Sequence, residues 1–376
     1  SYYGDIINCT VKNATVAAAV KNNDDGDKVG GVVGRLSVEE GIGSVKNCTA
    51  ENVTVKGYRQ VGGVLGGAYK TSGSYDVSGN TAKNCTIIND RSNNYNNLTE
   101  FDAREVIGTP AALNDASTKE NVTIELIKAP IVVEAGATPA ATQTNVTNAI
   151  AAATAGDTII LPNVEGGVKL INAAPGVTIK GDGNTVINAT DGGQIARIDG
   201  VTLDGLVINC GQSNYHGFQH SNVTLRNCTI NGLLFSYGTM VFEGCTFNQT
   251  AVEYNMWAYT SVTYKDCTFN TCGKAVNVYS EGATVQYKVV FDGCTFNNMN
   301  NPAKKPAVLI KSNGSNPEFY RYDVEIKNCT VNGNWPTNYI VDEGEAQIGN
   351  NPLYDIEKNG TDIKLTVDGV QIYPAA

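Results

Sequence analysis

One tripeptide, Asn-Cys-Thr, recurs along the chain and limits the folds that the chain can adopt. It stands at 8–10, 47–49, 84–86, 227–229 and 328–330, and Gly-Cys-Thr or Asp-Cys-Thr replaces it at 244–246, 266–268 and 293–295. Eight of the ten cysteines lie in this context. From Cys210 to Cys267, successive cysteines are 17 to 22 residues apart, the length of one coil of a solenoid protein. The intervals of 39 and 37 residues before Cys85 predict two such units each.

Around each cysteine the residues alternate between the two faces of a strand. In 222–230 the inward positions are Val223, Leu225, Cys228 and Ile230. A period of two indicates short strands, and Asn227 suits the turn between them because asparagine tolerates the left-handed conformation. Strands in stacked coils would pair with their equivalents about 4.8 Å away. The sequence therefore predicts an all-β fold, a parallel β-helix, in which the turn asparagines bond to one another as a ladder.

Composition agrees with this fold and excludes several others. Charged residues make up 17% of the 376 residues, well below the usual ~25%, which argues against a coiled coil or a helix bundle. The 41% of apolar residues argue against disorder. A net charge of -10 without a basic run makes the chain a poor binder of nucleic acid. No apolar run approaches the ~20 residues that span a bilayer.

Residues 144–345 resemble the right-handed β-helix of the pectate-lyase-like superfamily. The resemblance rests on the alanine-rich segment 145–157, on the apolar strand 158–161 and on the start of the coils at 177–187. In that superfamily such a segment is a helix that covers the open apolar end of the solenoid. The resemblance therefore implies right-handed coils, a short capping helix near 145–155 and a groove along one parallel sheet.

Residues 1–128 resemble the GLUG repeats of bacterial surface proteins. The segments Val29-Gly-Gly-Val-Val-Gly34 and Val61-Gly-Gly-Val-Leu-Gly-Gly67 carry this resemblance, and glycine in strands lets backbones pack closely. We expect an array at 1–128 that extends upstream of Ser1 in the native protein, followed by a linker at 129–143. A second solenoid would cover 144–376, with its last strands closing the far end.

The cysteines suggest neither a metal centre nor a disulfide framework. No Cys-x-x-Cys occurs, and His216 and His220 have no nearby cysteine pair, so a zinc site is not expected. Cysteines stacked in register point the same way, which gives poor disulfide geometry. We expect a ladder of small buried residues with Cys272 outside it. The ladder positions are Asn227, Cys228, Cys245, Cys267, Cys294, Asn328 and Cys329. The 15 Asn-x-Ser/Thr sequons follow from the same turns, so we interpret them as structural.

The strand after each Cys-Thr unit is where the superfamily binds its substrates. One outward column is predicted to hold Gln219, Ser236, Asn255, Tyr279, Lys311 and Asp342, and the other Leu234, Glu253, Asn277, Leu309 and Ile340. Glycoside hydrolysis needs two carboxylates about 5–10 Å apart, whereas Glu253 and Asp342 are three coils apart, or ~14 Å. A carboxylate beside Lys311 would oppose its use as a lyase base.

The motifs of the superfamily's enzymes are incomplete in this chain. The pair His216-Gly217 lacks the second glycine of a polygalacturonase motif, and Leu309-Ile-Lys311 lacks the arginine of another. No outward column supplies the three acidic calcium ligands of pectate lyases. Lys311, Tyr279, Glu253 and Asp342 are therefore weak catalytic candidates, and two histidines in the whole chain weigh against general acid–base chemistry.

Aromatic residues are the stronger functional signal. Trp257 and Tyr259 fall on one predicted coil and Tyr279 on the next. Exposed aromatic rings stack on the apolar faces of sugars. The predicted glycan-binding strip consists of Trp257, Tyr259, Asn255, Tyr279, Gln219 and Asn277.

We expect a secreted or cell-surface, adhesin-like monomer that binds a glycan or a host or matrix component without catalysis. A polysaccharide lyase or hydrolase, and a purely structural spacer, are the alternatives. No cofactor is expected, although the carboxylates of Asp24-Asp-Gly-Asp27 leave calcium open because they lack the full EF-hand spacing.

Overall fold

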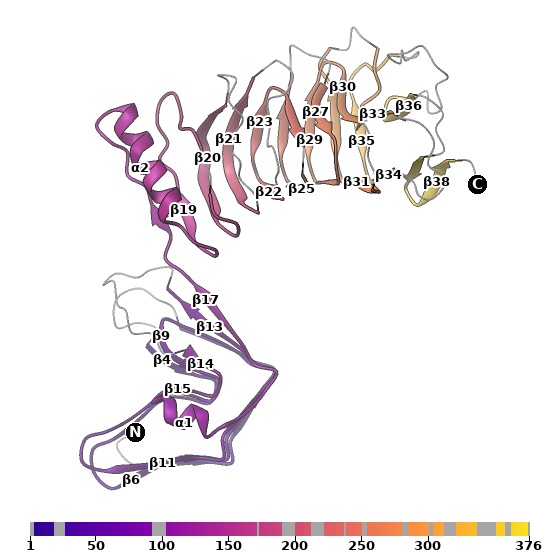
Figure 1. Cartoon of the computed structure of the whole chain (residues 1–376). Helices are drawn as coiled ribbons and strands as arrows, with labels where there is room; N and C mark the ends of the chain where they lie inside the picture. Colours follow the sequence, from indigo (N-terminus) through magenta and orange to yellow (C-terminus); the bar gives the residue numbers. More distant parts are fainter. Residues whose placement is uncertain are drawn as a thin grey trace. The chain divides into compact units, whose positions relative to one another are not determined.

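A computed structural model of the chain describes residues 4–18, 27–91, 103–170, 173–189, 200–211, 222–236, 238–249, 254–279, 285–300, 304–311, 321–336, 351–357 and 362–374. The chain divides into two compact units, unit 1 at 1–129 and unit 2 at 130–376 (Figure 1). In both units nearly all paired strands are parallel, and each strand pairs with its equivalent in the next coil. The predicted all-β parallel β-helix is confirmed.

Unit 1 has several short sheets, one for each side of its coils. They are β1 (Asp5–Ile7), β6 (Ile42–Lys46) and β11 (Ser74–Ser78); β2 (Thr10–Lys12), β7 (Thr49–Glu51), β12 (Thr81–Lys83) and β16 (Thr118–Glu120); β3 (Thr15–Ala17), β8 (Thr54–Gly57), β13 (Thr86–Asp90) and β17 (Thr123–Ile127); β4 (Asp27–Gly30), β9 (Arg59–Gly62) and β14 (Ala103–Arg104); and β5 (Val33–Val38), β10 (Leu65–Lys70) and β15 (Ile107–Thr109). The short helix α1 (Ala111–Asp115) follows β15.

The coils of unit 1 are longer than predicted. Thr49 pairs with Thr10, 39 residues earlier, so this interval is one coil and the prediction of two short units was wrong. The next pairing, Thr49 with Thr81, spans 32 residues. The glycine segments make the tight inner sides of these coils: a Cβ on Gly62 would lie 2.3 Å from the carbonyl oxygen of Leu65 and 2.6 Å from the nitrogen of Gly108. Only glycine allows backbones to approach so closely.

Unit 2 is built on two parallel sheets. The larger sheet begins with β18 (Ile131–Val132), β19 (Thr158–Ile160), β20 (Thr178–Ala189) and β21 (Thr202–Cys210). It then continues as two columns of strands. One column is β22 (Val223–Arg226), β25 (Met240–Glu243), β28 (Val262–Lys265), β31 (Tyr287–Asp292), β34 (Tyr322–Lys327) and β37 (Ile363–Val367); the other is β23 (Thr229–Asn231), β26 (Thr246–Asn248), β29 (Thr268–Thr271), β32 (Thr295–Asn298) and β35 (Thr330–Asn332). The second sheet is β24 (Leu234–Ser236), β27 (Tyr254–Ala258), β30 (Lys274–Val278), β33 (Val308–Lys311) and β36 (Tyr354–Glu357).

Both ends of unit 2 carry a distinct element. Helix α2 (Pro139–Ala152) begins within the segment expected as a linker; the Thr138 side chain accepts a hydrogen bond from the Ala141 N–H and so caps it. The helix buries Val146 and Ile150 against the hydrophobic core of the unit. At the other end β38 (Val370–Tyr373) pairs antiparallel with β37. Neither helix in the described part of the chain is long and apolar enough to cross a membrane.

The interior of unit 2 stacks like residues on one another. The inward positions predicted in 222–230, from Val223 to Ile230, are all buried. One aromatic column is Phe242, Tyr264 and Phe291, with ring centroids 5.3 and 4.8 Å apart. A second is Phe247, Phe269 and Phe296, with centroids 4.5 and 5.1 Å apart. The coil spacing of about 4.8 Å suits stacked rings, so each coil presents its ring to the next.

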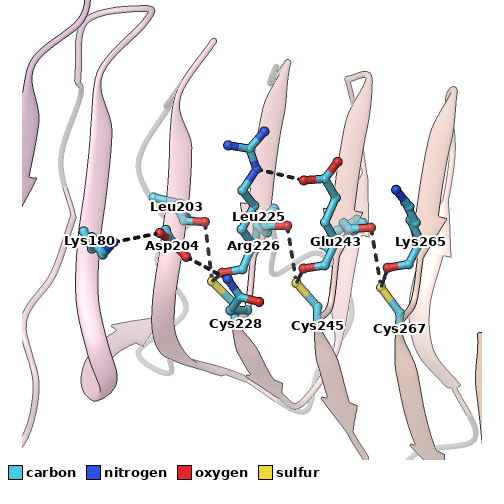
Figure 2. Close-up of polar contacts among 12 residues, drawn as sticks. Lys180, Leu203, Asp204, Leu225, Arg226, Cys228, Glu243, Cys245, Lys265 and Cys267 are labelled. Carbon is cyan, nitrogen blue, oxygen red and sulfur yellow. Dashed lines mark hydrogen bonds and ion pairs between the residues drawn. The ribbon is translucent and has the colours of Figure 1, made fainter. Parts of the chain in front are cut away.

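The cysteines lie at the corners of the coils, and all ten, which fall within the described residues, are thiols. The Cys245 thiol donates to the carbonyl of Glu243 in its own strand at 3.6 Å and to that of Leu225 in the preceding coil at 3.4 Å (Figure 2). Cys228 and Cys267 make the same pair of contacts. The repeated cysteine is therefore a small buried residue that also donates to two carbonyls where the chain turns.

Cys210 is not part of this ladder. Its neighbour Asn209 pairs with Asn231, and Val207 pairs with Thr229, so Leu206 takes the ladder position in this coil. Burial raises the pKa of the Cys210 thiol to about 12.

The turn asparagines adopt the left-handed conformation as expected, with φ between 50 and 55° at Asn8, Asn47, Asn84, Asn227 and Asn328. Their ladder forms only in unit 1, where the amides of Asn52, Asn84 and Asn121 each donate to the preceding member, beginning at Asn13. In unit 2, Asn227 and Asn328 donate to Asp204 and Asp292 instead. The continuous ladder of unit 2 stands three residues beyond the cysteines and consists of Asn209, Asn231, Asn248, Asn270, Asn297 and Asn332.

Candidate functional site

The second sheet of unit 2 carries a cluster of aromatic and charged side chains on its outward side. Strand register places Trp257 beside Asn277 and Lys311 beside Glu357, and Val278 pairs with Ile310. Tyr259, Tyr279, Lys311 and Glu357 therefore share one outward column, and Trp257 begins the column next to it. We call these five residues the aromatic face.

The three rings of the aromatic face contact one another. The rings of Trp257 and Tyr259 have centroids 5.3 Å apart and planes 25° apart. Those of Trp257 and Tyr279 are 5.8 Å apart with a tilt of 43°. The indole Nε1–H donates to the Tyr279 carbonyl at 3.0 Å, which holds the indole against the next coil. All three residues are half-buried, so the cluster combines fixed orientation with an accessible part.

An ion pair extends the aromatic face by two coils. The ammonium of Lys311 lies 5.6 Å from the centroid of the Tyr279 ring, within the range of a cation–π contact. It also lies 3.1 Å from Oε1 of Glu357. The Lys311 side chain is 17% exposed and that of Glu357 is 1% exposed. Because Glu357 is buried, removal of its partner would leave a buried charge that water cannot solvate.

The predicted columns were partly wrong. Tyr279 and Lys311 do share a column, as do Asn277 and Leu309. Ser236 and Leu234, however, pair with Ala258 and Met256 and face the interior.

The aromatic face also differs from the predicted strip in composition. Tyr259 lies in the column where Asn255 was expected, and Glu357 lies beside Lys311 where Asp342 was expected. Glu357 carried no repeat marker, and only the alternation in 354–357 could have suggested its strand.

Two residues of the predicted glycan-binding strip are buried. Asn255 is fully buried and its amide donates to the carbonyl of Asn270 at 3.1 Å. Asn277 is 3% exposed although it stands in the outward column. Neither offers a surface to a ligand in this conformation. Gln219, Glu253 and Asp342 lie outside the described residues, as do His216 and His220.

Two further features of unit 2 bear on chemistry. Asp355 and Glu357 lie two residues apart on β36, yet both are buried. A cavity of about 510 Å³ lies at the ends of β32 and β35, and its described lining is Asn298, Met299, Asn300, Gly333 and Asn334. This lining is uncharged. Among the described residues, no three His, Cys, Asp or Glu side chains are grouped as a metal site would require.

No protein-family model matches this chain, and a search of curated proteins found no match. Any functional assignment must therefore come from the geometry of the chain itself.

Proposed function

We propose that this chain is an adhesin-like β-solenoid of the cell surface or extracellular space that binds glycans through the aromatic face without catalysis. In this proposal unit 2 belongs to the pectate-lyase-like solenoids, and unit 1 is a GLUG-like array that acts as a spacer. The single observation that carries the proposal is the contact cluster of Trp257, Tyr259 and Tyr279 on one side of the second sheet.

The geometry of the rings supports sugar binding for two reasons. Aromatic faces bury the apolar C–H face of a pyranose ring, and half-buried rings leave area for such a contact. The hydrogen bond from Trp257 to Tyr279 fixes the indole before any ligand arrives. A preorganised platform loses little conformational entropy on binding, so a modest contact area can give measurable affinity.

The test is binding to a panel of soluble polysaccharides, measured by affinity electrophoresis and then by calorimetry. We expect Trp257→Ala and Tyr259→Ala each to weaken binding at least tenfold, which corresponds to about 1.4 kcal/mol. Tyr75→Ala is the matched control, because Tyr75 is a half-buried tyrosine of unit 1. Circular dichroism of each variant separates lost binding from lost folding. Unchanged affinity in folded Trp257→Ala, or no wild-type binding across the panel, would refute the proposal.

A polysaccharide lyase is the second candidate, because Lys311 and Tyr279 lie in contact on the same face. An ion-paired lysine is an ammonium, however, and a lyase needs a base that accepts the proton next to a carboxylate. The discriminating measurement is the release of unsaturated or reducing ends from the same polysaccharide panel. Product formation that disappears in Lys311→Ala would replace the binding proposal with a lyase.

A further inference from the structure

The charge of the aromatic face determines which glycans it can accept. Among the described residues of the second sheet, the basic side chains are Lys274 and Lys311. Lys274 is buried, with 2% of its surface exposed. Lys311 is thus the cation nearest to the rings, and its ammonium is already engaged by Glu357 and by the Tyr279 ring.

From this arrangement we infer that the aromatic face binds neutral polysaccharides, built of uncharged hexose or pentose units, and rejects polyuronates. The inference rests on the proposed function and names the ligand class of the same site. A uronate carboxylate would have to compete with Glu357 for Lys311. The displaced Glu357 carboxylate is 1% exposed and would become a buried, uncompensated charge, which is strongly unfavourable.

Long-range electrostatics act in the same direction but can be separated from this local effect. The chain has a net charge of -10, which repels a polyanion at low ionic strength. Salt at about 1 M shortens the Debye length to roughly 3 Å and removes that repulsion, whereas a buried ion pair is screened much less. Rejection that survives high salt therefore comes from the pair of Lys311 and Glu357.

The experiment compares each polysaccharide that binds with a partner that differs only in charge. A neutral polymer is paired with its C6-oxidised uronate form, and a uronate polymer with its carboxyl-reduced form, each at 0.1 M and 1 M sodium chloride. We expect the neutral member to bind at least tenfold more tightly at both salt concentrations. A wild type that binds the uronate member equally or better overturns this inference and leaves glycan binding intact. A wild type that binds neither member of any pair defeats the proposed function as well.

The variant Glu357→Gln tests the mechanism with almost no change in shape. Without the competing carboxylate, Lys311 can pair with a uronate, so we expect uronate binding to strengthen at least tenfold while neutral binding changes by less than about twofold. Unchanged uronate binding in a folded variant overturns the role of the ion pair. If that variant does not fold, Lys311→Met together with Glu357→Met removes both charges, and uronates should then bind more tightly than they bind the wild type. Continued full rejection by the double variant overturns the inference.

Discussion

Two outward columns of unit 2 stand on the same coils and differ in kind. On β23, β26, β29, β32 and β35, an asparagine recurs in every coil and each amide bonds its equivalent at 2.7 to 3.1 Å. On the aromatic face, successive coils present Tyr259, Tyr279, Lys311 and Glu357, so each residue contacts a different chemical group. A repeated residue satisfies its own equivalents and stabilises the stack. A varied column leaves groups that can meet something other than the next coil.

The largest effect should come from the repeated interior. Phe269 is fully buried between Phe247 and Phe296, so Phe269→Ala removes contacts to two coils and leaves a cavity. We expect a loss of about 3–5 kcal/mol in the free energy of unfolding, measured by guanidinium titration. Trp257→Ala should lose less, because the indole is only half-buried. Equal losses in the two variants would contradict the division into a structural interior and a binding face.

The asparagine ladder should contribute to stability without contributing to binding. Asn248 donates to Asn231 at 2.9 Å and accepts from Asn270 at 2.7 Å, so Asn248→Ala leaves two half-buried amide groups without this partner. We expect a loss of about 1–3 kcal/mol. Asn332→Ala is the matched control and should lose less, since Asn332 is exposed and lies at the last coil of the ladder. Weaker glycan binding in Asn248→Ala, with stability unchanged, would place the ligand on the wrong column.

The repeated columns were predictable from the sequence because they carry their own marker. The cysteine of each Cys-Thr unit fixes the inward parity, and Ile230, Phe247 and Phe269 follow it by two residues. The aromatic face has no marker. Only two residues separate Thr271 from β30, whereas nine separate Asn298 from β33. The variable spacing displaced the predicted register, most clearly at Asn255 and Asp342.

Unit 1 misled the count of coils for a different reason. Asn80 occupies the place that Cys48 holds one coil earlier, and its side chain accepts a hydrogen bond from the Cys48 N–H at 3.0 Å while donating to the Val45 carbonyl at 2.8 Å. Asparagine thus replaces the cysteine at this corner. The next cysteine, Cys85, stands at the following corner, where Val53 is its equivalent. Counting cysteines therefore skipped a coil, and only the pairing of the strands reveals it.

The smallest predicted effect concerns an imperfection in the repeated interior. Tyr264 stacks between Phe242 and Phe291, and its buried hydroxyl has no hydrogen-bond partner among the described residues. Tyr264→Phe should therefore raise the free energy of unfolding, by about 1 kcal/mol at neutral pH, because it removes an unsatisfied polar group. Burial also raises the pKa of Tyr264 well above its usual value of 10.0.

The raised pKa gives the Tyr264→Phe variant a pH signature. The folded protein keeps the phenol proton to higher pH than the unfolded chain does, so wild-type stability is complete below pH 10 and falls as the pH rises further. Phenylalanine cannot ionise, and the advantage of the variant should therefore widen above about pH 10. Guanidinium titrations at pH 7 and pH 10.5 measure both effects. A variant that is less stable than the wild type at pH 7 would mean that the hydroxyl has a partner, such as a bound water, and that this tyrosine is a specific contact in the stack.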